Sequence, residues 1–128
     1  MAKVLVDASV VIDYLRRPDR EKSNFARIRG VWDMVMSFVT VTELYSGMSS
    51  KDKETAGLID EIVDSCEIRY VNLKQSKQAG MMRRDYKLLL GDSYIAQLAI
   101  EDGLPLATLN NKDFRKVKGL KFWGGRSF

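Results

Sequence analysis

The hydrophobic pattern begins with a short apolar run, Val4-Leu5-Val6, which stops at Asp7. The run is continuous rather than alternating, which is typical of a strand that is buried on both faces. Other short apolar or alternating runs predict further strands. The expected strands cover residues 3–6, 33–39, 68–73, 104–108 and 120–123.

Between these runs, apolar residues recur at helical spacing. The expected helices cover residues 10–17, 23–32, 40–46, 53–65, 74–89 and 93–101. Alternation of strands and helices argues for an α/β sandwich around a mostly parallel sheet of about five strands. No repeat, low-complexity tract or linker interrupts the pattern. We therefore expect one domain over residues 1–123 and a flexible tail over 124–128.

One expected helix carries an apolar stripe that allows two interpretations. Ile59, Ile62, Val63 and Cys66 lie on one face of segment 53–65. The stripe could pack into the core or against another protein surface, and the core is the favoured interpretation.

Composition narrows the class of protein. The 128 residues are 45% hydrophobic and 30% charged, and no apolar stretch approaches the ~20 residues that cross a bilayer. We expect no membrane association. Because no secretory signal is present and Cys66 is the only cysteine, we expect a cytoplasmic location. Histidine is absent, which excludes Ser-His and Cys-His nucleophiles and imidazole-bound zinc.

The charge of the chain is uneven. Residues 1–64 hold 9 basic and 11 acidic residues, whereas residues 65–128 hold 12 basic and 6 acidic ones. The basic half suits an anionic polymer such as RNA or DNA, although an ordinary solvated surface explains the composition equally well.

Acidic residues follow several of the expected strands. Asp7 ends the first strand, Glu43 lies in the helix after the second, and Asp92 begins the penultimate helix. Asn110 and Asp113 follow the strand at 104–108. Because ligands bind beyond the carboxyl ends of parallel strands, we expect these side chains to meet at one edge of the sheet.

Each acid also has a purely structural interpretation, because such residues commonly cap helices or start turns. The structural candidates are Asp7 or Ser9 as the cap of the first helix, Thr40 with Glu43 as a capping box, Asp92 as an N-cap and Asp113 as the start of a turn. Four independent caps, however, have no need to share one edge of a sheet.

The position of Asp92 favours a cation. Ile95, Ala96 and Ala99 share its helix face, so the carboxylate is expected to be partly desolvated and to need a backbone partner or a positive charge. Clustered carboxylates repel one another, and a hard divalent ion relieves that repulsion. A metal ion held by oxygen atoms can activate water and orient a phosphodiester.

These motifs, in this order, resemble PIN domains, and among them the VapC-type toxin ribonucleases of type II toxin–antitoxin modules. The resemblance covers nearly the whole chain. The residues that carry it are VLVDASV at 4–10, TEL at 42–44, DSYIA at 92–96 and TLNNKDF at 108–114.

The resemblance implies a three-layer α/β/α PIN-like fold and a Mg²⁺- or Mn²⁺-dependent endoribonuclease. Such an enzyme cuts RNA by attack of water and leaves 5′-phosphate and 3′-hydroxyl ends. Asp7, Glu43 and Asp92 match the three core acids of the family. The fourth acid corresponds to either Asn110 or Asp113, and Asp113 is favoured, with Asn110 as a polar neighbour.

Other family features are implied in the same way. Ser9 and Thr108 match positions that often support the acids by hydrogen bonding. The resemblance also implies a homodimer and a cognate VapB-like antitoxin.

Basic and aromatic residues supply candidate RNA contacts. Lys112 and Arg115 flank Asp113, and Arg83 and Lys87 share a helix face. Tyr14 or Tyr94 could stack on bases. The alternative to an enzyme is a catalytically silent PIN-like module that binds RNA or protein, and the complete acidic set argues against it.

Overall fold

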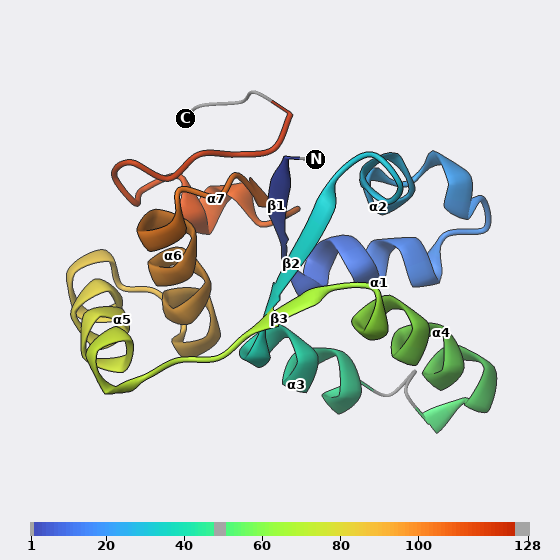
Figure 1. Ribbon diagram of the computed structural model, residues 1–128, viewed down its shortest axis with the longest axis horizontal. Helices are drawn as coiled ribbons and strands as arrows, with labels where there is room; N and C mark the ends of the chain where they lie inside the picture. Colours follow the sequence, from blue (N-terminus) through green and yellow to red (C-terminus); the bar gives the residue numbers. More distant parts are fainter. Residues whose placement is uncertain (1, 48–50, 125–128) are drawn as a thin grey trace.

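The computed structural model describes residues 2–47 and 51–124, in which a parallel sheet lies between helices (Figure 1). Its strands are β1 (Lys3–Val6), β2 (Asp33–Ser37), β3 (Glu67–Arg69) and β4 (Leu106–Ala107), in the order β3-β2-β1-β4. All three pairings are parallel. β1 lies between β2 and β4, with Val4 opposite Met34 and Val6 opposite Ala107.

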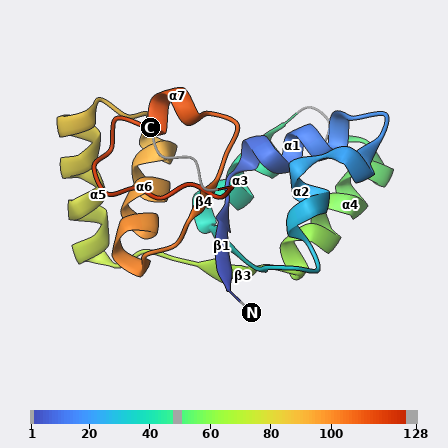
Figure 2. The same ribbon diagram turned by 90° about the horizontal axis from the view of Figure 1, so that it is seen from above.

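The helices form the two outer layers. They are α1 (Ala8–Arg16), the short 3-10 helix η1 (Arg20–Lys22), α2 (Asn24–Ile28), α3 (Phe38–Ser46), α4 (Lys53–Asp64), α5 (Leu73–Tyr86), α6 (Leu90–Asp102) and α7 (Asn111–Phe114). Seen from above, α1, α2 and α4 lie on one side of the sheet, and α5, α6 and α7 on the other (Figure 2). The predicted three-layer α/β/α fold is confirmed.

The predicted count of about five strands is wrong for the described residues, in which the sheet has four. The segment expected to form the fifth strand makes only an isolated parallel bridge between Phe122 and Leu106. Two backbone hydrogen bonds hold it there, from Leu106 N–H to the Lys121 carbonyl and from Trp123 N–H to the Leu106 carbonyl, both 2.9 Å. Gly119 (φ 82°) and Gly124 (φ 92°) turn the chain at either side, which keeps the pairing short.

Several other elements are shorter than expected. The strand predicted over 33–39 ends at Ser37, and the strand predicted over 104–108 covers only Leu106–Ala107. The helix predicted over 23–32 extends only over Asn24–Ile28, because Ser23 caps its start and Gly30, at φ 83°, turns the chain towards β2. The strand predicted over 68–73 ends at Arg69, because Asn72 and Gln75 form a capping box that begins α5.

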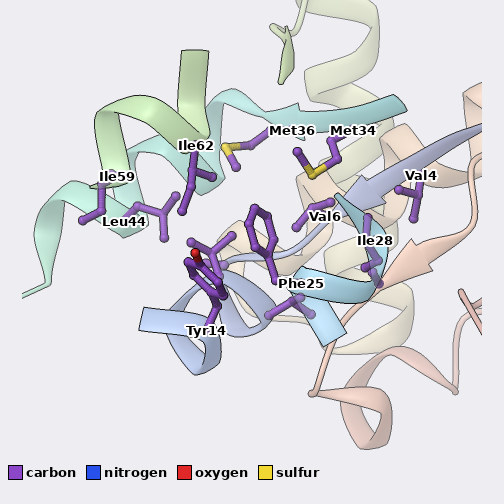
Figure 3. Close-up of a cluster of buried hydrophobic side chains, with 14 residues drawn as sticks. Val4, Val6, Tyr14, Phe25, Ile28, Met34, Met36, Leu44, Ile59 and Ile62 are labelled. Atoms are coloured by element: carbon purple, nitrogen blue, oxygen red, sulfur yellow. The ribbon is translucent and has the colours of Figure 1, made fainter. Parts of the chain in front are cut away.

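Both faces of the sheet are buried, as the continuous apolar run predicts. Val4, Val6, Met34 and Met36 point into one core cluster, where residues of α1, α2, α3 and α4 cover them (Figure 3). The alternate residues Leu5 and Val35 belong to a second cluster, formed mainly with α6 and the segment after β4. This double burial fixes β1 at the centre of the sheet, and Asp7 follows directly at its end.

The stripe on α4 belongs to the core, as favoured above, because Ile59 and Ile62 are fully buried and Val63 and Cys66 pack against them. Among the described helices, none has the length and apolar character needed to span a membrane. The predicted tail at 124–128 lies, beyond Gly124, outside the described residues.

Candidate functional site

The strand order brings the ends of β1 and β4 together. From β1 the chain proceeds outward through β2 to β3, and it then returns to the opposite side of β1 as β4. The gap between two strands whose connections diverge in this way is where open α/β sheets bind ligands. Asp7 follows β1 and Thr108 follows β4, so both lie at this point.

Asp7 is buried, with 6% of its surface exposed, and two hydroxyl groups hold its carboxylate. Ser9 Oγ donates to Asp7 Oδ2 at 2.9 Å, and Thr108 Oγ1 donates to the same oxygen at 2.8 Å. Both hydroxyls are themselves fixed, because Leu109 N–H donates to Ser9 Oγ and Asn110 N–H to Thr108 Oγ1, each at 2.9 Å. Asp7 occupies the N-cap position of α1, but its side chain makes no capping hydrogen bond within the described structure. The capping interpretation therefore does not account for this carboxylate.

Glu43 lies within α3 and is not part of a capping box. The helix begins earlier than expected, at Phe38, because Ser37 Oγ accepts from Val39 N–H and Ser37 is the N-cap. Glu43 is therefore well inside the helix, and its carboxylate lies beside Gly91 of α6, where a Cβ atom would be 3.6 Å from Glu43 Oε1.

The Glu43 side chain as a whole is exposed, but its carboxylate is partly withdrawn from water. This desolvation, followed by the negative charges of Asp7 and Asp92, raises the pKa of Glu43 to about 7.

Asp92 differs from the other acids in having a buried carboxylate oxygen without a hydrogen bond in the described structure. It lies in the first turn of α6, and Leu89 rather than Asp92 is the N-cap. Its Oδ2 atom is buried and has no hydrogen-bond partner among the described residues. Burial, and then the charges of Asp7 and Asp113, raise the pKa of Asp92 to about 6, while the charge of Lys116 opposes this rise. The predicted desolvation of Asp92 is confirmed, and neither a backbone partner nor a cap relieves it.

Asp113 and Asn110 occupy different positions at the start of α7. Asn110 is the N-cap, and in the described structure its side chain makes no capping bond. Asp113 lies in the first turn of α7, is partly buried and acts electrostatically on Asp92. Of the two residues, Asp113 is thus the one whose charge joins the group formed with Asp7, Glu43 and Asp92, which we call the acidic cluster.

The acidic cluster fits a hydrated divalent ion. Among the described residues, no three acidic or cysteine side chains are arranged to hold one ion by direct ligation. Mg²⁺, however, usually keeps several waters and is bound through one or two carboxylates. The mutual repulsion of the acids and the unpaired Asp92 oxygen are what such an ion would relieve.

The candidate RNA contacts lie on the surface, and one aromatic candidate does not. Lys112, Arg115, Arg83 and Lys87 are all exposed. Tyr14 is only 7% exposed, because it packs against Phe25 and Arg29, so stacking of a base on Tyr14 is ruled out. Tyr94 is partly exposed and contacts Phe38 edge-on, with 5.3 Å between ring centroids.

Lys116 also acts on this site and is not among the basic residues that the sequence singles out. Its spacing of three from Asp113 is the signal that places the two residues on one side of a helical turn.

The comparison with protein families agrees with this geometry. A model of the PIN domain family matches residues 4–120. The chain belongs to the PIN domain family.

Among curated proteins, this PIN domain is similar to Ribonuclease VapC1 of Methanocaldococcus jannaschii. The two are 30% identical over 135 aligned positions, which cover 95% of this chain and 88% of that protein.

Solved structures share the fold. The VapBC2 complex of Rickettsia felis, bound to a DNA fragment from its promoter, matches with a TM-score of 0.76 and 20% identity over 94% of this chain and 96% of the other. A toxin–antitoxin complex from Klebsiella pneumoniae matches with a TM-score of 0.75 and 24% identity, covering 91% and 94% of the two chains. These matches establish the fold of the PIN domain.

Proposed function

We propose that this PIN domain is a metal-dependent endoribonuclease that hydrolyses RNA phosphodiester bonds and is the toxin of a VapBC-type toxin–antitoxin module. The observation that carries the proposal is the electrostatic coupling of four acids at the carboxyl edge of the sheet in a chain without histidine. The identity with Ribonuclease VapC1 along almost the whole chain supports the same activity.

The proposed cofactor is Mg²⁺ or Mn²⁺. Asp7, Glu43, Asp92 and Asp113 supply hard oxygen atoms, which both ions prefer, and they are the proposed catalytic residues and ligands, directly or through bound water. When bound, such an ion activates water and stabilises negative charge on the phosphate oxygens.

Residues of the chain prepare the site for this ion. Ser9 and Thr108 both donate to Oδ2 of Asp7, so the orientation of that carboxylate is fixed before any ligand binds. Asn110 contributes through its backbone N–H, which holds the Thr108 hydroxyl. In the ion-free protein, the raised pKa of Glu43, about 7, means that this side chain binds a proton near neutral pH.

The proposed substrate is RNA, with Lys112, Arg115, Arg83 and Lys87 as phosphate contacts. Each is exposed, which leaves its charge available to a polyanion. Water attack would leave 5′-phosphate and 3′-hydroxyl ends.

The proposed partners are a cognate VapB-like antitoxin and a second copy of the chain, and the proposed location is the cytoplasm. The solved relatives include complexes described as VapBC or toxin–antitoxin assemblies, which supports the antitoxin as a partner.

An RNase assay with Asp7→Asn tests the activity. The variant removes one negative charge from the acidic cluster, and we expect cleavage of single-stranded RNA in Mn²⁺ to fall by at least a hundredfold. EDTA should stop cleavage by the wild type. Asp64→Asn, an exposed acid at the end of α4, is the matched control and should cleave like the wild type.

The same assay separates the alternative of a catalytically silent module. Cleavage that survives Asp7→Asn, or that is absent from the wild type with Mn²⁺ over RNAs of varied sequence and structure, would remove the nuclease proposal. RNA binding without cleavage would then favour the silent module.

A further inference from the structure

Lys116 lies one helical turn beyond Asp113. The backbone remains helical past α7, because Arg115 has φ −62° and ψ −20° and its N–H donates to the Asn111 carbonyl at 2.8 Å. The N–H of Val117 donates to the Phe114 carbonyl at 3.0 Å. Residues three apart on such a turn project from the same side, so Lys116 and Asp113 face the same region.

The ammonium group of Lys116 reaches the segment that leads to Asp92. Its Nζ donates to the carbonyl of Lys87 at 3.4 Å. Lys87 ends α5 in the left-handed conformation, at φ 56° and ψ 47°, and lies three residues before the start of α6. Asp92 is in the first turn of α6. Lys116 therefore connects the turn that follows Asp113 to the end of α5, from which a short loop leads to α6 and Asp92.

This contact leaves the charge of Lys116 available. A donor–acceptor distance of 3.4 Å is longer than a strong hydrogen bond, and the contact is exposed. Lys3, Arg17 and Arg69 each form an ion pair with a carboxylate, whereas Lys116 forms none within the described chain. Its ammonium group nevertheless lies close enough to the acidic cluster for its charge to act on Asp92.

We propose that Lys116 binds a phosphate oxygen of RNA beside the acidic cluster and thereby positions the phosphodiester for hydrolysis. The inference rests on the proposed nuclease function and adds a substrate-binding residue to it. A phosphodiester that approaches several carboxylates is repelled unless a positive charge lies next to them, and Lys116 supplies such a charge. Lys116 exchanges its long bond with the neutral Lys87 carbonyl for a bond to a phosphate oxygen, in which both partners are charged and the attraction is stronger.

Fluorescence anisotropy with a short labelled single-stranded RNA of mixed sequence tests the contact. EDTA prevents cleavage during the measurement. We expect Lys116→Met to weaken binding roughly three- to tenfold and to reduce the slope of log K against log salt by about 0.7, the value for one phosphate contact on a single strand. Lys116→Arg should restore both affinity and slope, which a purely structural role would not predict. Thermal melting of each variant verifies folding.

The matched control is Lys53→Met at the start of α4, which removes the same charge from an exposed position on the other side of the sheet. If Lys116→Met equals this control in affinity and salt slope while the wild type binds and cleaves RNA, the inference fails and the proposed function stands. If the wild type neither binds RNA nor cleaves it in Mn²⁺, both fail.

Discussion

The hydroxyl group of Thr108 connects Asp7 to the loop after β4. It donates to Asp7 Oδ2 at 2.8 Å and accepts the N–H of Asn110 at 2.9 Å. Thr108→Val keeps the shape of the side chain but removes both bonds in a buried position. We expect a loss of about 1–2 kcal/mol in the free energy of unfolding and a fall in RNA cleavage of roughly tenfold or more. Urea denaturation and the cleavage assay measure the two effects.

Thr55→Val is the control for this prediction. Thr55 also donates to an aspartate, Asp52 Oδ2, at the same 2.8 Å, but at the exposed start of α4. It should lower stability slightly and leave cleavage unchanged. Equal cleavage by the Thr108 and Thr55 variants would show that the Asp7 contact has no part in activity.

The residue at which a helix begins determines whether its acidic residue caps the helix or is available to the site. The sequence allowed Thr40 and Glu43 to begin α3 as a capping box. In the structure Ser37 is the N-cap, so Glu43 has no capping role. Leu89 occupies the N-cap position of α6, so Asp92 lies inside the first turn and is not its cap. Local patterns could not choose between these starts, because Ser37 and Thr40 are both good N-caps and only packing on the sheet decides.

The approach of α6 to Glu43 depends on Gly91. A methyl group at this position would lie 3.6 Å from Glu43 Oε1, which is an ordinary contact without a clash. Gly91→Ala should therefore stabilise α6 by up to ~1 kcal/mol, while it places an apolar group against the carboxylate and lowers cleavage several-fold. Thermal melting and the cleavage assay provide the measurements.

Gly80→Ala is the matched change in α5, where a Cβ would meet nothing within 4 Å. It should give a similar gain in melting temperature without any change in cleavage. If Gly91→Ala cleaves RNA as fast as Gly80→Ala, a methyl group beside the Glu43 carboxylate does not affect cleavage, and the prediction is wrong.

For the whole molecule, the sequence predicted the layers and the nearness of the four acids better than the edges of the sheet. The doubly buried β1 and the strand–helix alternation depend on burial, which apolar runs report directly. The isolated bridge at Phe122 and the contact from Lys116 to Lys87 depend on turns and long-range geometry. No local pattern encodes such contacts, so the fifth strand was predicted wrongly and Lys116 was missed.

The acidic cluster also links the stability of the whole fold to pH. The pKa values of Glu43 and Asp92 are raised to about 7 and about 6, from ordinary values of 4.5 and 3.8. Between the ordinary and the raised values, the folded protein binds more protons than the unfolded chain, so its stability falls as pH rises through that window. Glu67 and Asp85, whose pKa values are lowered by hydrogen bonds from Arg69 and Arg84, act in the opposite direction and only at lower pH.

We therefore expect the ion-free protein to lose on the order of 2 kcal/mol of stability between pH 5 and 8, after allowance for solvent screening. Melting temperatures in EDTA across this range measure the loss. Asp92→Asn should flatten the profile, because it removes one of the two raised groups and a charge that acts on the other. Mn²⁺ at a hundred times its dissociation constant should stabilise the wild type by about 2.7 kcal/mol at pH 8. Two results would contradict this account. One is a melting temperature in EDTA that does not change between pH 5 and 8, and the other is a stabilisation by Mn²⁺ that is as large for Asp92→Asn as for the wild type. Either would show that the ion does not act by relieving repulsion within the acidic cluster.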